Sequence, residues 1–266
     1  MKNAAIGIFD SGIGGLTIAH SIKEKMSNES IIYFGDTKHL PYGEKSESVI
    51  QDFSLSITKF LLQQNCKAIV IACNSASSVS YQKVKELAGD IPVFNVIEPV
   101  VNYVNENCKN SNIGIIGTKA TIQSNIYSNK ILAENPTQKV FSLATPLLAP
   151  MIEEGFINEE ISRTIIQNYL KNPILKDINS LILACTHYPL IQEEIQQYYK
   201  GNINVIDSAN IVSNYINKKL SSLNLRSQTP NADYHFYVSN YTSSFEKSAQ
   251  FFFQENIKLE EITLHQ

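Results

Sequence analysis

Residues 69–75 read IVIACNS and residues 181–187 read LILACTH, so one short pattern occurs twice in the chain. Each copy is an apolar run that ends in Ala-Cys and continues with polar residues. Apolar runs of this length are typical of strands buried in a parallel sheet, and the change to polar residues marks the strand end. The repeat therefore predicts two duplicated strand-turn units, each with a cysteine at the carboxyl end of its strand.

Similar apolar runs alternate with amphipathic stretches through the first part of the chain. This alternation predicts a parallel sheet with crossover helices. The predicted strands are residues 5–9, 31–34, 68–72 and 92–96, and the predicted helices are residues 16–26, 47–64 and 77–87.

The pattern then restarts, with strands predicted at residues 113–116, 140–142, 181–184 and 205–206 and helices at 121–134, 159–170 and 190–199. Helices at 209–220 and 243–254 flank a further strand at 234–238, which predicts that the chain returns to its first sheet. We predict an α/β fold of two pseudo-symmetric doubly wound domains with mainly parallel sheets. Residues 1–97 plus 208–266 form the first domain and residues 98–207 the second. Because ligands bind beyond the carboxyl ends of such strands, the active site is expected in the cleft between them.

The bulk composition excludes several classes of protein. The 266 residues are 43% hydrophobic and 18% charged with a net charge of -3, and Lys and Arg are scattered rather than clustered. This pattern predicts a globular protein with no nucleic-acid partner. No stretch resembles a signal peptide or a membrane span, so a cytoplasmic protein without a membrane partner is expected. The four cysteines should be free thiols, and their spacing lacks the CxxC pairs of a zinc site.

Cys73 and Cys185 are the candidate catalytic residues, whereas Cys66 and Cys108 lack the strand-end context. A single cysteine at a strand end is usually a small core residue, but two in equivalent positions favour a function. Two thiols on opposite sides of one carbon can invert it, because one thiolate removes a proton while the other thiol donates one. A free cysteine has a pKa of about 8.5, so each thiol needs neighbours that help it to ionise.

Asp10 and His187 lie at the predicted cleft edge and are candidates to assist the thiols. The simpler interpretations are helix capping by Asp10 and a histidine hydrogen-bonded within its loop. The glycine-rich segment at 10–17, DSGIGGLT, could hold an anion with its backbone amides. It lacks the lysine of a P-loop and the GxGxxG spacing of a dinucleotide site, so a carboxylate is the more economical ligand.

Five segments together resemble the bacterial glutamate racemases of the aspartate/glutamate racemase family. They are FDSGIGGLT from residue 9, FGDTKHLPYG from 34, ACNSAS from 72, GTKAT from 117 and ACTHYPL from 184. The resemblance implies interconversion of L- and D-glutamate, without a cofactor or metal, to supply D-glutamate for peptidoglycan. It also implies a homodimer.

By this resemblance Cys73 deprotonates D-glutamate and Cys185 deprotonates L-glutamate, with Asp10 and His187 assisting. Ser75 stands where a threonine is common in the family, and it keeps the hydroxyl group. The substrate contacts implied by the family are Asp10, Ser11, Pro41, Tyr42, Gly43, Asn74, Ser75, Thr118, Thr121, Thr186 and His187.

Three other functions are open at this point. The chain could be a related racemase or isomerase that acts on aspartate, a hydantoin or maleate. It could be a binding module that holds an amino acid between two α/β halves. It could also be a cysteine hydrolase built on Cys185 and His187, although that interpretation leaves Cys73 without a role.

Overall fold

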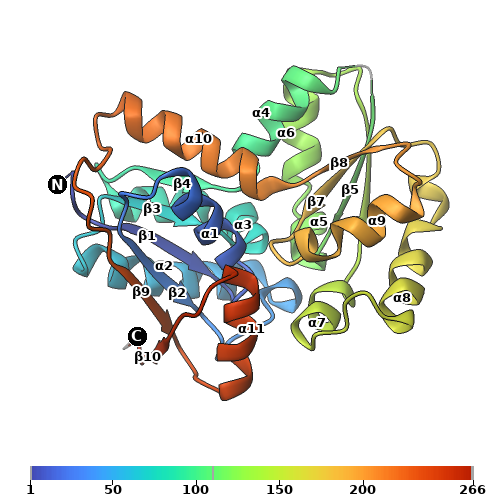
Figure 1. The fold of residues 1–266 in the computed structure, drawn as a ribbon. Helices are drawn as coiled ribbons and strands as arrows, with labels where there is room; N and C mark the ends of the chain where they lie inside the picture. Colours follow the sequence, from blue (N-terminus) through green and yellow to red (C-terminus); the bar gives the residue numbers. More distant parts are fainter. Residues whose placement is uncertain (1, 110, 265–266) are drawn as a thin grey trace.

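The computed structural model describes residues 2–109 and 111–264, which fold around two separate parallel sheets (Figure 1). The chain first alternates strand and helix, as the apolar and amphipathic stretches predict. These elements are β1 (Ile6–Asp10), α1 (Leu16–Lys25), β2 (Ile31–Gly35), η1 (Tyr42–Glu44), α2 (Glu47–Gln63), β3 (Ala68–Ile71), α3 (Asn74–Ala88), β4 (Val93–Asn95) and α4 (Ile97–Asn107).

The second sheet is built from the middle of the chain, and the last strands return to the first sheet. The middle elements are β5 (Asn112–Gly117), α5 (Lys119–Gln123), α6 (Ile126–Glu134), β6 (Lys139–Ala144), α7 (Leu148–Glu153), α8 (Glu160–Leu170), η2 (Pro173–Leu175), β7 (Ser180–Ala184), η3 (Tyr188–Ile191), α9 (Gln192–Tyr198) and β8 (Asn204–Ile206). The last are α10 (Ser208–Ser222), β9 (Tyr234–Val238), α11 (Ser243–Phe253) and β10 (Leu259–Glu261).

The two sheets repeat one strand order. The six-stranded sheet runs β10-β9-β2-β1-β3-β4 and the four-stranded sheet runs β6-β5-β7-β8, with every pair parallel. β1 corresponds to β5, β3 to β7 and β4 to β8, while β9 and β10 extend the first sheet beyond β2. The predicted pseudo-symmetric α/β fold is confirmed, and β3 and β7 carry the two copies of the repeated sequence.

Helices cover both faces of the six-stranded sheet because its strands are apolar on both sides. Phe9, Ile69 and Ile71 pack with Ile50 and Ile57 of α2 on one face. Side chains of the opposite face join a larger core with α1, α10 and α11 that continues into the four-stranded sheet. This continuous core joins the two sheets, and so it fixes the carboxyl end of β3 relative to that of β7.

Several sequence predictions need correction. Residues 121–134 do not form one helix, because Asn125 adopts the left-handed conformation, with φ of 54°, and separates α5 from α6. The predicted helix at 190–199 begins as the 3-10 turn η3, and α3 begins three residues earlier than predicted, directly after Cys73. Helices α4 and α7 and strand β10 were not predicted.

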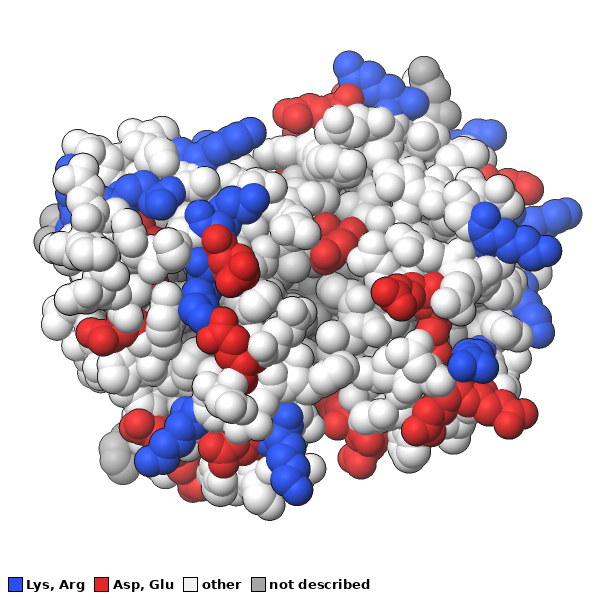
Figure 2. Space-filling view, in the orientation of Figure 1, with Lys and Arg blue, Asp and Glu red and all other residues white. Residues whose placement is uncertain are grey.

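Acidic and basic side chains are intermingled over the face of the molecule shown in Figure 2. None of the helices within residues 2–109 and 111–264 combines the length and apolar character needed to cross a bilayer.

Candidate active site

Cys73 lies at the carboxyl end of β3 and caps the N-terminus of α3. Its Sγ atom accepts a hydrogen bond from the backbone N–H of Ala76 at 3.4 Å and donates one to Oγ of Ser11 at 3.6 Å. Ser11 follows β1, which is the neighbour of β3 in the sheet. The thiol is thus held between two adjacent strand ends, where a helix N-terminus favours negative charge.

Burial, and after it the negative charge of Asp10, raise the pKa of Cys73 to about 12, against smaller lowering effects from Ala76 and Ser11. Cys73 is therefore protonated at neutral pH in the absence of ligand. It is ready to donate a proton rather than to accept one.

Cys185 follows β7 and has a different partner. Its Sγ atom lies 3.5 Å from Nδ1 of His187, and Nε2 of the same ring lies 2.8 Å from Oε1 of Glu153 at the end of α7. No α-helix begins directly after this cysteine, because residues 188–191 form the 3-10 turn η3 and α9 starts only at Gln192. Cys185 therefore has the His187 imidazole as its neighbour, where Cys73 has the N-terminus of α3.

The His187 imidazole favours its charged form. Burial lowers its pKa, but the charge and hydrogen bond of Cys185 and the Glu153 carboxylate together raise the pKa well above its ordinary value. A protonated imidazole beside a sulfur stabilises the thiolate. The two sulfurs therefore have different neighbours, a helix N-terminus beside Cys73 and an imidazole beside Cys185.

Asp10 lies at the end of β1, and its Oδ2 atom accepts hydrogen bonds from the backbone N–H groups of Gly12 and Gly15 at 3.1 and 3.0 Å. Burial raises the pKa of Asp10, while the His187 charge and these two amides lower it. The side chain is buried, and its Oδ1 atom has no hydrogen-bond partner within the described structure. Asp10 caps the glycine-rich loop and influences Cys73 through its charge.

Gly14 brings this loop against the turn that carries His187. A Cβ atom on Gly14 would lie 2.5 Å from Nδ1 of His187 and 2.7 Å from Oγ1 of Thr186, closer than real Cβ contacts allow. The carbonyl of Thr186 also accepts a hydrogen bond from Oγ1 of Thr17 at 3.2 Å. The glycine-rich loop therefore allows the loops of the two sheets to approach closely, a role that is separate from anion binding.

Three hydroxyl groups meet where α3 faces α5. Oγ of Ser75 lies 2.8 Å from Oγ1 of Thr118 and 3.4 Å from Oγ1 of Thr121. Beside them, Oδ1 of Asn74 accepts a hydrogen bond from the Tyr127 hydroxyl at 2.7 Å, and its buried Nδ2 atom has no partner among the described residues. The hydroxyl groups and the Asn74 amide can donate to the carboxylate of a small ligand, and the hydroxyl oxygens can accept from its amino group.

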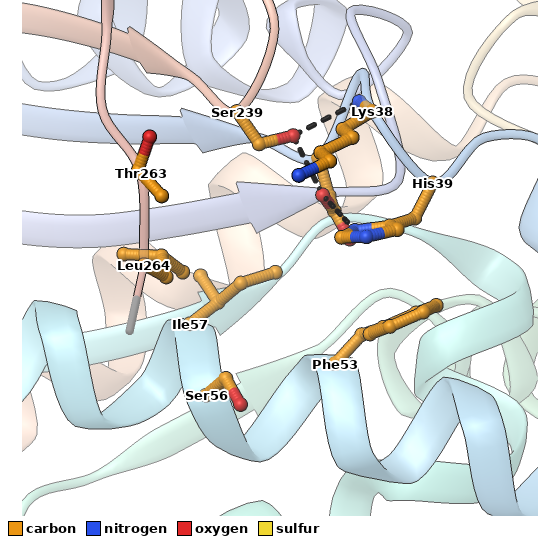
Figure 3. A pocket seen from close by; sticks show the side chains of 9 residues that line it. Lys38, His39, Phe53, Ser56, Ile57, Ser239, Thr263 and Leu264 are labelled. Atoms are coloured by element: carbon orange, nitrogen blue, oxygen red, sulfur yellow. Dashed lines mark hydrogen bonds and ion pairs between the residues drawn. The ribbon is translucent and has the colours of Figure 1, made fainter. Parts of the chain in front are cut away.

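Residues 36–44 form a loop that closes one side of the site. The Tyr42 hydroxyl donates a hydrogen bond to Oδ2 of Asp36 at 2.6 Å, so this hydroxyl is engaged within the loop. Asp36 also accepts from Nδ1 of His39 and from Oγ of Ser239. Figure 3 shows the separate pocket behind this loop, where His39 stacks on Phe53 with ring centroids 4.1 Å apart. Asp36 thus fastens the loop that positions Pro41 and Gly43.

The structure brings most of the predicted site residues to one pocket. The predicted residues that line it are Ser11, Pro41, Tyr42, Gly43, Cys73, Asn74, Ser75, Thr118, Cys185, Thr186 and His187. Asp10 and Thr121 do not line it, but both contact residues that do: the Asp10 charge acts on Cys73, and Thr121 bonds to Ser75.

Four lining residues were not predicted, namely Leu40, Ala149, Pro150 and Glu153. Leu40 lies within the PYG-containing segment and could have been included from its position there. Glu153 has no local signal, because it is one of two adjacent glutamates in an otherwise ordinary helix end. Among the described residues no group of three or more His, Cys, Asp or Glu side chains could hold a metal ion.

Comparison with known proteins decides the family. Residues 15–215 match the model of the Asp/Glu/Hydantoin racemase family. The chain belongs to this family. A glutamate racemase of Neisseria meningitidis serogroup A / serotype 4A is 41% identical over 246 residues, covering 92% of this chain and 90% of the relative. The glutamate racemase of Chlorobaculum tepidum is 38% identical over 94% of this chain and 93% of its own length.

The fold agrees with this membership. The crystal structure of a Francisella tularensis glutamate racemase in complex with D-glutamate superposes with a TM-score of 0.94. It shares 40% sequence identity, and the match covers 99% of both chains. The predicted membership of the aspartate/glutamate racemase family is confirmed, and the chain is an isomerase of the amino-acid racemase class.

Proposed function

We propose that this chain interconverts L- and D-glutamate by two opposed thiols. One observation carries the proposal: Cys73 and Cys185 follow corresponding strands of two separate sheets and line the same pocket. A cysteine hydrolase would need only one of them. A binding module would need neither thiol beside an imidazole or a helix N-terminus.

The different neighbours of the two sulfurs suggest the order of proton transfer. From L-glutamate, the Cys185 thiolate beside protonated His187 removes the α-proton, and the Cys73 thiol donates its proton to the opposite face of the α-carbon. One C–H bond breaks and one forms, so the substrate is inverted. Cys185 ends as a thiol and Cys73 as a thiolate, which is the starting state for D-glutamate.

The remaining lining groups suit a dicarboxylate substrate. Hydroxyl donors from Ser75 and Thr118 and the unpaired Nδ2 of Asn74 gather on one side of the sulfurs. Of the glycine-rich loop, Ser11 lines the pocket, while the backbone N–H groups of Gly12 and Gly15 bind Asp10. The names of the relatives, glutamate racemase in each case, favour glutamate over aspartate, a hydantoin or maleate.

The wider role follows from the resemblance to these relatives. We propose that the reaction needs no added cofactor, that it takes place in the cytoplasm as a supply of D-glutamate for peptidoglycan, and that the working enzyme is a homodimer. We also propose the domain division of residues 1–97 plus 208–266 and 98–207, which follows the two sheets.

Purified protein incubated with L-glutamate and no added cofactor tests the activity. Chiral chromatography should show conversion to an equal mixture of the two enantiomers, and L-aspartate in a parallel reaction should stay largely unconverted. Faster α-proton exchange of L-aspartate than of L-glutamate in deuterated solvent would contradict the glutamate assignment.

The two-thiol mechanism has its own test. The variants Cys73→Ala and Cys185→Ala should each lose racemisation, whereas Cys66→Ala and Cys108→Ala, which change buried cysteines outside the pocket, serve as matched controls. Racemisation retained by either pocket variant would show that a single base is sufficient.

A further inference from the structure

His187 is enclosed by side chains from both sheets. Cys185 and Glu153, which hold its two ring nitrogens, belong to elements around the four-stranded sheet. Its third neighbour is Phe252 on α11, beside the six-stranded sheet, with ring centroids 5.2 Å apart and ring planes at 81°. Figure 1 shows α11 on the side of the six-stranded sheet that faces α7. The imidazole of one sheet therefore packs against an aromatic ring supplied by the other.

The ring of His187 can turn about its Cβ–Cγ bond, and the hydrogen bonds at Nδ1 and Nε2 oppose this rotation. A ring packed nearly perpendicular to it, in an arrangement that aromatic pairs favour, opposes that rotation. Phe252 is only 1% exposed, so its own ring has little freedom to move.

Helix α11 holds Phe252 at a fixed place. Thr242 caps the helix, with its Oγ1 atom accepting a hydrogen bond from the Phe245 backbone N–H at 3.1 Å. The adjacent Phe253 packs against His20 and Phe236, with ring centroids 5.7 and 4.8 Å away. Phe253 thus anchors the helix to the six-stranded sheet, while Phe252 contacts His187.

We propose that Phe252 is a positioning residue for the reaction, because it holds the His187 ring with Nδ1 directed at the Cys185 sulfur. The proposal rests on the roles proposed above for Cys185 and His187. Phe252 itself does not line the pocket and acts only through the imidazole.

Phe252→Leu tests the proposal, and Phe253→Leu is its matched control. The two residues are neighbours on one helix and equally buried, at 1% exposure each, but only Phe252 contacts His187. The measurement is the rate at which iodoacetamide alkylates each cysteine, followed by mass spectrometry of the peptides. Cys73 in the same pocket is the internal reference, so a change in access to the pocket cancels in the ratio of Cys185 to Cys73.

Because the thiolate is the form that reacts, a displaced imidazole slows the alkylation of Cys185 but not that of Cys73. The ratio should fall about three- to ten-fold in Phe252→Leu, the range that loss of one aromatic contact implies, and stay unchanged in Phe253→Leu. In racemisation, kcat should fall by a similar factor with little change in KM.

An equal ratio in Phe252→Leu and wild type, or an equal fall in both variants, would overturn the proposal. If Phe252→Leu does not fold, Phe252→Met replaces it and the same criteria apply. Alkylation needs no substrate, so it decides the role of Phe252 even if the wild-type protein leaves glutamate unchanged. A wild-type protein that leaves glutamate unchanged would overturn only the proposed function.

Discussion

Nε2 of His187 and Oε1 of Glu153 lie 2.8 Å apart, although Glu153 ends α7 and His187 follows β7. The Glu153 carboxylate is one of the groups that raise the pKa of the imidazole. We predict that Glu153→Gln lowers the pKa of His187, because the amide carries no charge. The titration of the His187 Cε1 proton by NMR measures this change directly.

The same variant should lose activity. Loss of one charge-assisted hydrogen bond, worth about 1.5 kcal/mol, predicts a fall in kcat/KM of roughly tenfold. Glu154→Gln, at the exposed neighbouring position, is the control for the loss of one negative charge. An unchanged His187 titration in Glu153→Gln would mean that the carboxylate does not support the imidazole.

The close approach of Gly14 to His187 gives a steric prediction. In Gly14→Ala the new methyl group would lie 2.5 Å from Nδ1 of His187, so the ring or the loop has to move. We expect a large loss of kcat with retained secondary structure by circular dichroism. In Gly12→Ala the methyl group would meet its nearest atom, Cδ2 of Leu40, at an ordinary 3.5 Å, so a much smaller effect is expected. Equal losses in the two variants would contradict the steric explanation.

Burial of Asp10 predicts a pH-dependent stability. Because burial raises the pKa of this carboxyl, the unfolded chain binds fewer protons than the folded chain once the pH exceeds the ordinary aspartate range. The contribution of Asp10 to stability therefore falls as the pH rises through its raised pKa. Asp10→Asn removes this pH dependence of stability, because burial of a neutral amide costs the same free energy at every pH.

The free energy of unfolding of Asp10→Asn should therefore increase relative to that of the wild type as the pH rises from acid to neutral. Urea denaturation across this pH range measures the difference. Asp52→Asn, at an exposed position on α2, controls for the removed charge. A constant difference between Asp10→Asn and wild type at every pH would contradict the prediction.

The raised pKa of Cys73 predicts the pH profile of its alkylation. With a pKa of about 12, the thiolate fraction of Cys73 increases throughout the range from pH 7 to 10. The rate of alkylation should then rise about tenfold per pH unit without reaching a plateau, whereas an ordinary thiol levels off near a pKa of about 8.5. A plateau at or below pH 9 would show that Cys73 ionises as easily as a free cysteine.

The sequence predicts the parallel sheets well, because each buried strand is a short apolar run and each run ends at a polar turn. The same rule brings Cys73 and Cys185 to corresponding strand ends. The break at Asn125 was missed because only its positive φ, and no glycine, marks the division between α5 and α6. Strand β10 is a three-residue edge with two glutamates, so it carries almost no apolar signal.

The site was harder to predict where residues act through others. Glu153 reaches His187 from a helix end 34 positions away, and no motif links the two. Asp36 lies within the FGDTKHLPYG segment, but its role depends on contacts with Tyr42 and Ser239 that only the folded chain creates. Side chains that orient a catalytic group depend on tertiary distance, which a single sequence does not record.

Ser75 supplies the last prediction, because its hydroxyl joins α3 to the start of α5. In Ser75→Ala the Thr118 hydroxyl loses its 2.8 Å partner and Thr121 loses a longer contact. We expect the free energy of unfolding to fall by about 1 kcal/mol, as for one partly buried hydrogen bond, and KM for glutamate to rise. Ser75→Thr retains the hydroxyl and should keep both values close to those of the wild type. Urea denaturation and initial-rate kinetics of the two variants distinguish a lost hydroxyl from a change in side-chain volume. An effect of Ser75→Thr as large as that of Ser75→Ala would show that volume, and not the hydroxyl, matters at this position.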